Sequence, residues 1–471
     1  MKEHADKKSL IDSIKDTIKF SKDGSAVEIL NDKKLRSELI DELVWNSAFS
    51  PSEEVRNMSR FIIRLLGQKL GNGPASIFEV YKARGEGKIK GFTVPAINVR
   101  QLSYDFARAV FRAAKKANVG LFIFEIARSE SGYTDQRPSE FAAAMLAAAI
   151  KENYPNPIFV QGDHYQVNGK KYKEDAAKEM KGAKDLLQES IEAGFFNIDL
   201  DTSTLVDLSK TSIDEQQKPN FDVAAELTKF TRSIQPEGID VMLGGEIGEI
   251  GGSNSNEAEM RAYLNGYLKE IGKISGISKI AVQTGTSHGG VPLPDGSIAS
   301  VKLDFNVLEK LGKIARDEYK ISGCVQHGAS TLPADLFDKF SKVETSEIHL
   351  ATEFQNMIFD SPAFPESLKK EINEWCVKNC AAERKSTDTD QQFLYKTRKK
   401  ANGPFKKAIW SLPQSARDTI TEALEEKFVF YFDKLNVKNS AEIVKKYVKT
   451  ANVAVKAPTS GGIKEAFEGA D

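Results

Sequence analysis

The middle of the chain alternates eight times between a short apolar or β-branched run and a segment with helical spacing. The runs are almost continuously apolar, which is typical of parallel strands buried on both faces. The segments between them repeat apolar residues every three or four positions, the period of a helix. This pattern predicts an α/β fold, a (β/α)8 TIM barrel, with a doubly wound open sheet as the alternative. The expected strands are 91–99, 119–127, 157–164, 195–203, 240–248, 279–287, 319–328 and 347–354.

The two ends of the chain have a different pattern, with helix-like segments but no strand alternation. We therefore expect a helical N-terminal extension over residues 1–87, the barrel over 88–376 and a helical C-terminal extension over 377–471. Both extensions are expected to serve packing or oligomerisation. They are not expected to form separate catalytic domains.

Composition excludes several classes of protein. Lys plus Arg number 66 and Asp plus Glu number 67, so the net charge of -1 argues against a general nucleic-acid-binding protein. No apolar run approaches the length of a membrane span, and the polar N-terminus is not a secretory signal. Three cysteines do not form a disulfide framework. A cytoplasmic protein with no membrane partner is expected.

Four of the five histidines fall at the ends of expected strands or within the last one: His164, His288, His327 and His349. Catalytic groups of such barrels lie at the C-terminal ends of the strands. Imidazoles from three strand ends would leave one coordination position open, as a catalytic zinc requires. We therefore predict that His164, His288 and His327 bind one metal ion. A hydrogen-bonded structural histidine is the alternative for each alone.

Three carboxylates stand near these histidines. Asp163 directly precedes His164, and neighbouring residues of a regular strand point to opposite faces, so both can serve one site only where the strand ends. Asp201 and Glu246 end the fourth and fifth expected strands. Each is a candidate metal ligand, partner of an imidazole N–H, general base or member of a salt bridge.

Small residues end the last two strands. The turn HGAST at 327–331 offers backbone N–H groups and the Ser330 hydroxyl, and Thr352 follows the last strand. Many barrels bind a phosphate group in this region, so these residues are candidates for a phosphate site. The alternative is that the small residues end the strands for steric reasons.

At this point the motifs resemble a family, the class II, metal-dependent ketose-bisphosphate aldolases. The similar stretches run in order over about residues 90–355 and include FTVPAINVRQ, GDH, GFFNIDLDTS, EIGEIGG, QTGTSHGG, QHGAS and EIHLATEF. GTSHG and HGAS are the most specific of them. The resemblance implies aldol cleavage of a phosphorylated ketose, with fructose 1,6-bisphosphate as the default substrate.

The resemblance also assigns roles. It implies a zinc ion on His164, His288 and His327, with Asp201 and Glu246 close to the metal. Asp163 stands at the catalytic aspartate, which moves the proton of the C4 hydroxyl. Groups that hold the substrate and its phosphate are implied at Asn98, Gly289, Gly328, Ser330 and Thr352. Another divalent metal, and a monovalent cation near the phosphate, stay open, and a homo-oligomer is expected. No strand lysine stands out as a Schiff-base nucleophile.

The chain departs from the family at several positions. His349 and Ala351 stand where the family has Asn and Asp, so we expect His349 to donate a catalytic hydrogen bond or to change the substrate. The stretch after the second strand looks more like the second subunit of tagatose-bisphosphate aldolase, and Arg128 or Arg137 is the candidate for a distal phosphate. Two alternatives follow: an aldolase for another phosphorylated or acidic sugar, and a non-catalytic barrel subunit supporting a partner aldolase.

Overall fold

Eight parallel strands close into a barrel, which confirms the predicted fold. The computed structural model describes residues 2–248, 252–285, 303–450 and 453–455. Each strand pairs with the next along the chain, and the last pairs with the first. The barrel strands are β4 (Val94–Asn98), β5 (Ile123–Ala127), β6 (Ile158–Gln166), β7 (Asn197–Asp201), β8 (Met242–Glu246), β9 (Lys279–Ala281), β10 (Cys324–Gln326) and β11 (Glu347–Leu350).

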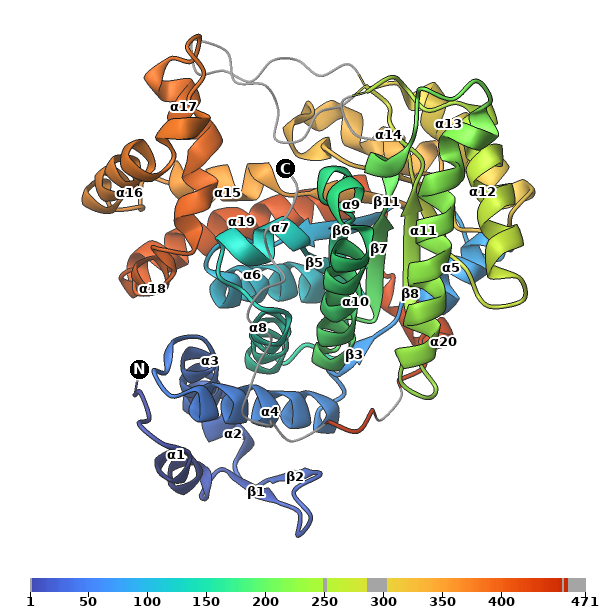
Figure 1. The fold of residues 1–471 in the computed structure, drawn as a ribbon. Coiled ribbons are helices and arrows are strands. Elements are labelled where there is room, and N and C mark those ends of the chain that lie inside the picture. Colours follow the sequence, from blue (N-terminus) through green and yellow to red (C-terminus); the bar gives the residue numbers. More distant parts are fainter. Residues whose placement is uncertain (1, 249–251, 286–302, 451–452, 456–471) are drawn as a thin grey trace.

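Helices follow the strands and cover the outside of the barrel (Figure 1). The longer ones form because their apolar residues repeat at helical spacing and pack on the strands. The α-helices of this layer are α6 (Ser103–Lys116), α7 (Arg128–Tyr133), α8 (Pro138–Lys151), α9 (Gly169–Glu174), α10 (Ala176–Ala193), α11 (Ile213–Ile234), α12 (Glu257–Ile271), α13 (Phe305–Asp317), α14 (Phe337–Lys342) and α15 (Thr352–Phe359). Short 3-10 turns lie in the loops after β7 and β10: η2 (Ser203–Leu205), η3 (Ala329–Thr331) and η4 (Ala334–Leu336).

The segment before the barrel is helical, as expected, but it also contains a hairpin that the sequence did not predict. Strands β1 (Ile18–Phe20) and β2 (Val27–Ile29) pair antiparallel. Gly24 in their turn has φ +71°, and Asp23 accepts hydrogen bonds from Ser21 and Ser25. An Asp-Gly pair is a hairpin signal because glycine tolerates this backbone conformation. The remaining elements are α1 (Lys7–Ile14), α2 (Asp32–Lys34), the π-helix η1 (Leu35–Leu39), α3 (Ile40–Phe49), α4 (Glu53–Lys69), β3 (Pro74–Ala75) and α5 (Phe78–Gly85).

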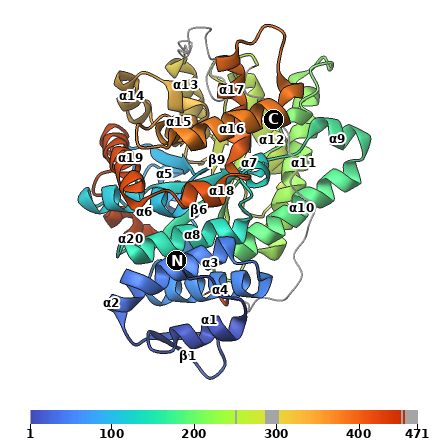
Figure 2. The same cartoon turned by 90° about the vertical axis from the view of Figure 1, so that its left-hand side faces the viewer.

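The segment after the barrel lies against barrel helices that flank the strand ends. Its elements are α16 (Glu366–Asn379), η5 (Ala381–Glu383), α17 (Asp390–Thr397), η6 (Arg398–Asn402), α18 (Lys406–Trp410), α19 (Gln414–Lys434) and α20 (Ala441–Tyr447). Figures 1 and 2 show α16 and α17 at the opposite end of the molecule from α1–α4. Gly403 donates to the carbonyl of Tyr133 in α7, and Arg398 donates to Asn356 in α15. The boundaries 1–87, 88–376 and 377–471 stay a prediction.

None of the helices in the described part of the chain combines the length and apolar character needed to cross a membrane. The core runs from the outer helices into the strands, whose residues are buried almost throughout. The interior of the barrel differs from this apolar shell, because strands β5, β6, β7, β9 and β11 each place an ionisable or amide side chain there.

Candidate active site

A β-bulge in strand β6 brings Asp163 and His164 to the same site. The pairing of β6 with β7 gains one residue on β6 between Gly162 and Tyr165. His164 has φ +39°, in the left-handed region that residues other than glycine rarely adopt. The sequence predicts that both side chains serve one site only where the strand ends. The strand in fact continues to Gln166, and the bulge re-aims the two side chains within it.

His164 and His327 meet at the C-terminal ends of β6 and β10. Their ring centroids lie 4.1 Å apart. With Glu246 at the end of β8 they form a group whose ligand atoms all lie within 4.8 Å of one another. This N, N, O donor set suits zinc or another divalent transition metal. His288 and Gly289 lie outside the described residues, so the structure does not address their predicted roles.

Asp201 orients His164. Its Oδ2 lies 3.1 Å from His164 Nδ1 and accepts a hydrogen bond from Gln166 at 2.6 Å, while its Oδ1 accepts one from the Ser203 hydroxyl at 2.7 Å. These contacts use the lone pairs of Asp201. They are typical of a carboxylate that accepts a hydrogen bond from one nitrogen of an imidazole and so orients the other nitrogen toward a metal. Glu246 Oε2 lies 3.4 Å from the same nitrogen of His164.

Burial and mutual repulsion control the ionisation of this group. Burial and the charge of Asp201 raise the pKa of Glu246 to about 7. Burial lowers the pKa of His164, but the charges of Asp163 and Glu246 outweigh it and raise that pKa well above 6.5. A metal ion that binds here must therefore displace protons, which is usual for imidazole and carboxylate ligands.

His349 lies between two carboxylates in the barrel interior. Its Nδ1 is 3.0 Å from Asp163 Oδ1, and its Nε2 is 2.7 Å from Glu347 Oε1. Its ring centroid is 4.2 Å from that of His327. Burial lowers the pKa of His349, but Glu125 and Asp163 raise it well above 6.5. Both ring nitrogens are placed to donate, so His349 connects the interior of the barrel to Asp163.

Lys279 is a buried residue next to the site that sequence reasoning missed. No strand lysine stands out in the sequence as a Schiff-base nucleophile, and another role for a strand lysine is not predicted; Lys279 begins β9, and its side chain is fully buried in the barrel. Its Nζ lies 2.9 Å from Asp199 Oδ1 and forms an ion pair with Glu347 Oε1. Burial lowers the pKa of Lys279, but these two charges outweigh it and raise that pKa. The lysine in "SKIAV" was the available signal, since lysine is rare in a fully buried strand.

The residues predicted to hold a phosphate lie at the ends of β10 and β11. Gly328 has φ +68°, and Ser330 Oγ accepts a hydrogen bond from the backbone N–H of Ala351 at 2.6 Å. Thr352 begins α15, whose first N–H groups face this end of the barrel. Asn98, at the end of β4, donates to Glu130 Oε2 at 2.5 Å.

The two arginines considered for a distal phosphate both have internal partners. Arg128 lies 2.7 Å from Glu179 Oε1 and donates to the carbonyl of Gln166. Arg137 pairs with Glu189. Their guanidinium groups thus hold α10 against the loop after β5.

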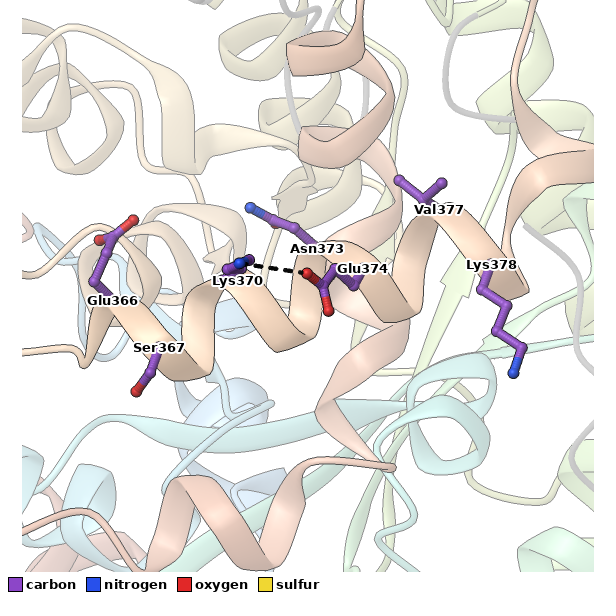
Figure 3. A pocket seen from close by; sticks show the side chains of 7 residues that line it. All are labelled: Glu366, Ser367, Lys370, Asn373, Glu374, Val377 and Lys378. Atoms are coloured by element: carbon purple, nitrogen blue, oxygen red, sulfur yellow. Dashed lines mark ion pairs between the residues drawn. The ribbon is translucent and has the colours of Figure 1, made fainter.

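A separate surface cavity of about 620 Å³ lies along the outer face of α16 (Figure 3). Its described lining residues all come from this one helix: Glu366, Ser367, Lys370, Asn373, Glu374, Val377 and Lys378. They include no histidine or cysteine, and Lys370 pairs with Glu374 at 3.9 Å. We assign no chemistry to this cavity.

The chain is similar to one protein family and to several solved structures. The family model described as "Fructose-bisphosphate aldolase class-II" matches residues 85–431. A probable tagatose 6 phosphate kinase from Sinorhizobium meliloti 1021 superposes with a TM-score of 0.51 and 16% identity, over 75% of this chain and 99% of that one. The fructose-bisphosphate aldolase of Campylobacter jejuni gives a TM-score of 0.47 and 19% identity, over 79% and 99%. The YdjI aldolase of Escherichia coli K12 gives 0.45 and 14%, over 78% and 99%.

The probable kinase and this chain share a fold. The family model matches most of the chain, including every strand of the barrel and each described residue of the site. The protein therefore belongs to the class II fructose-bisphosphate aldolase family and is an aldolase, a carbon–carbon lyase.

Proposed function

We propose that this enzyme is a metal-dependent aldolase that cleaves and forms a phosphorylated ketose, with fructose 1,6-bisphosphate as the first substrate to test. The observation that supports this most directly is the convergence of His164, His327 and Glu246, with Asp163 beside them, at the C-terminal ends of three different strands. A divalent metal held there, with zinc as the first candidate, would supply Lewis-acid stabilisation of the charge that develops on the ketone oxygen.

The protein's own groups would then perform the remaining steps. Asp163 would accept the proton of the C4 hydroxyl in cleavage and return it in condensation, a general acid–base role. His349 holds the Asp163 carboxylate through a contact to Oδ1. Gly328, Ser330 and Thr352 would bind the phosphate near the N-terminus of α15.

Another phosphorylated sugar is the second candidate, and a specific observation favours it. His349 stands where the resembled family has an asparagine, and it donates to Asp163 and Glu347. Because both of its nitrogens are engaged, His349 cannot contact the substrate as a free amide would.

The cytoplasmic location and the homo-oligomer also stay predictions.

The test is a substrate panel on the zinc-loaded, full-length protein. Fructose 1,6-bisphosphate, tagatose 1,6-bisphosphate and the ketose monophosphates are assayed for triose phosphate release, while zinc is measured by elemental analysis. We expect one equivalent of zinc and turnover of fructose 1,6-bisphosphate that a chelator abolishes. Turnover of another sugar alone would overturn the default substrate. Absence of both zinc and turnover would instead favour the non-catalytic subunit.

A further inference from the structure

Lys279 occupies a site that is built for one ammonium group. Its Nζ donates to Glu347 Oε1, to Asp199 Oδ2 at 3.0 Å and to Gln161 Oε1 at 3.0 Å. These three acceptors come from β11, β7 and β6 and match the three N–H donors of a lysine ammonium. Lys279, Gln161 and Glu347 have no exposed surface. The side chain is therefore fixed from three directions.

Glu347 is the first group that Lys279 holds. Besides the ammonium, its Oε1 accepts from Gln161 Nε2 at 2.9 Å and lies 2.7 Å from His349 Nε2. Its Oε2 accepts from the hydroxyl of Tyr81. A carboxylate with so many donors has one orientation, and that orientation determines where His349 stands.

His349 passes this constraint on to the reaction centre. The Nδ1 and Nε2 atoms lie on opposite sides of the imidazole ring, and here they face Asp163 Oδ1 and Glu347 Oε1. A continuous path of hydrogen bonds thus runs from Lys279 through Glu347 and His349 to Asp163. Each member is at least nine-tenths buried, so no bulk water competes with it.

We propose that Lys279 is a positioning residue for the aldol step: its ammonium fixes Glu347, and through His349 it sets the orientation of the Asp163 carboxylate. This inference rests on the proposed function, in which Asp163 moves the substrate proton. The described contacts of Lys279 do not include the proposed metal ligands His164 and Glu246.

A second cation site in the same interior is the competing interpretation, because Glu125, Glu347 and His349 also bring ligand atoms within 4.8 Å of one another. Lys279 argues against it. Its ammonium already lies against Glu347, so a metal ion there would face a positive charge within contact distance. Lys279 itself therefore supplies the positive charge beside Glu347.

The test is a double-mutant cycle on the zinc-loaded protein, with fructose 1,6-bisphosphate as substrate and the other sugars of the panel in reserve. The variants are Lys279→Met, His349→Asn and their combination. Asparagine is too short to span from Glu347 to Asp163, so His349→Asn breaks the path. The control is Lys406→Met, because Lys406 is also a buried lysine, paired with Glu140 at 2.9 Å but outside the barrel interior.

We expect Lys279→Met to lower kcat at least tenfold, with KM within about twofold and zinc content unchanged. In the His349→Asn background the same change should lower kcat by less than twofold, because the path is already broken. Lys406→Met should leave kcat within twofold. If Lys279→Met does not fold, Lys279→Gln replaces it, since glutamine keeps two of the three donors and loses the charge and some length. The same pattern is expected.

Multiplicative losses in the double variant, or a rise in KM alone, would overturn the inference and leave the proposed function standing. A parent protein that cleaves none of the sugars overturns the proposed function and this inference with it.

Discussion

Replacing Asp163 with asparagine separates acid–base catalysis from metal binding. The change preserves the size and shape of the side chain, and asparagine Oδ1 can still accept from His349 Nδ1, now 3.0 Å away. Only the negative charge and the ability to take up a proton are lost. We therefore expect Asp163→Asn to retain zinc and to bind substrate with little change in KM.

The size of the effect follows from the role. A positioned general acid–base group contributes about 10²- to 10⁴-fold in rate, or about 3–5 kcal/mol of transition-state stabilisation. We expect kcat to fall by this factor. Stability should change little. The Asp163 charge raises the pKa values of Glu125 and Glu246 by repulsion, and it attracts His349 and His164. Its removal loses unfavourable and favourable interactions together, so the melting temperature should shift by only a few degrees.

The assay measures kcat, KM, zinc content and melting temperature for the parent and for Asp163→Asn. The matched control is Asp105→Asn. Asp105 is a similarly buried aspartate that pairs with Arg108 and Arg417 on the outer helices, so its loss should affect stability and leave kcat unchanged. If Asp163→Asn loses zinc as fully as a histidine variant does, then Asp163 is a metal ligand and the acid–base assignment is wrong.

Three other changes test the site. His327→Ala should reduce zinc binding at least tenfold by equilibrium dialysis and abolish turnover. His327 belongs to two groups of potential metal ligands, one with His164 and Glu246 and one with Asp163 and His349; full zinc retention would contradict this. Gly162→Ala should lower both stability, by about 1–3 kcal/mol in denaturant unfolding, and kcat, because the new Cβ would lie 2.4 Å from the Tyr165 ring and disturb the bulge; an unchanged kcat would show that the bulge does not position the site. The zinc affinity of the metal-free protein should fall as the pH drops through about 7. The raised pKa of Glu246 keeps this carboxyl protonated below that pH, and because the proton competes with the metal, Glu246 alone should lower the affinity by about tenfold per pH unit. Glu246→Gln should flatten this pH profile.

The barrel could be predicted from the sequence because strands buried on both faces are almost continuously apolar. Every expected strand is present, although each is shorter than its apolar run, or shifted along it, because a run continues into the loops on either side. The position of the histidines followed from the same logic, since the C-terminal ends of parallel strands meet at one rim. His164, His327 and His349 lie together for this reason.

The local geometry of the site could not be predicted in the same way. A bulge adds one residue to one strand, and nothing in GDHY indicates that His164 takes a positive φ. Lys279 was missed because a lysine at a strand end is usually exposed, and its three acceptors come from strands far apart in the sequence. Contacts across the interior of a barrel form only when the sheet closes, and the order of apolar and polar residues along the sequence does not show which side chains then meet.

The strained His164 and the charged interior are two departures from ordinary folding rules at one place. A left-handed conformation at a residue other than glycine costs about 1–3 kcal/mol, and buried charges are tolerated only when their partners are complete. Sites that break local rules while the rest of the chain obeys them are expected to be functional. Here the bulge brings Asp163 and His164 to the C-terminal ends of the strands, and His349 in the barrel interior contacts Asp163.

The same geometry bears on which aldol chemistry this barrel can perform. A lysine that forms a Schiff base must reach the substrate carbonyl as a free amine. Lys279 is charged, its three N–H donors each have an acceptor, and Glu347 and His349 lie between it and Asp163. Its raised pKa disfavours the neutral form further. Lys279 is therefore placed to support a carboxylate that moves protons, and its position in the barrel argues against a role as nucleophile.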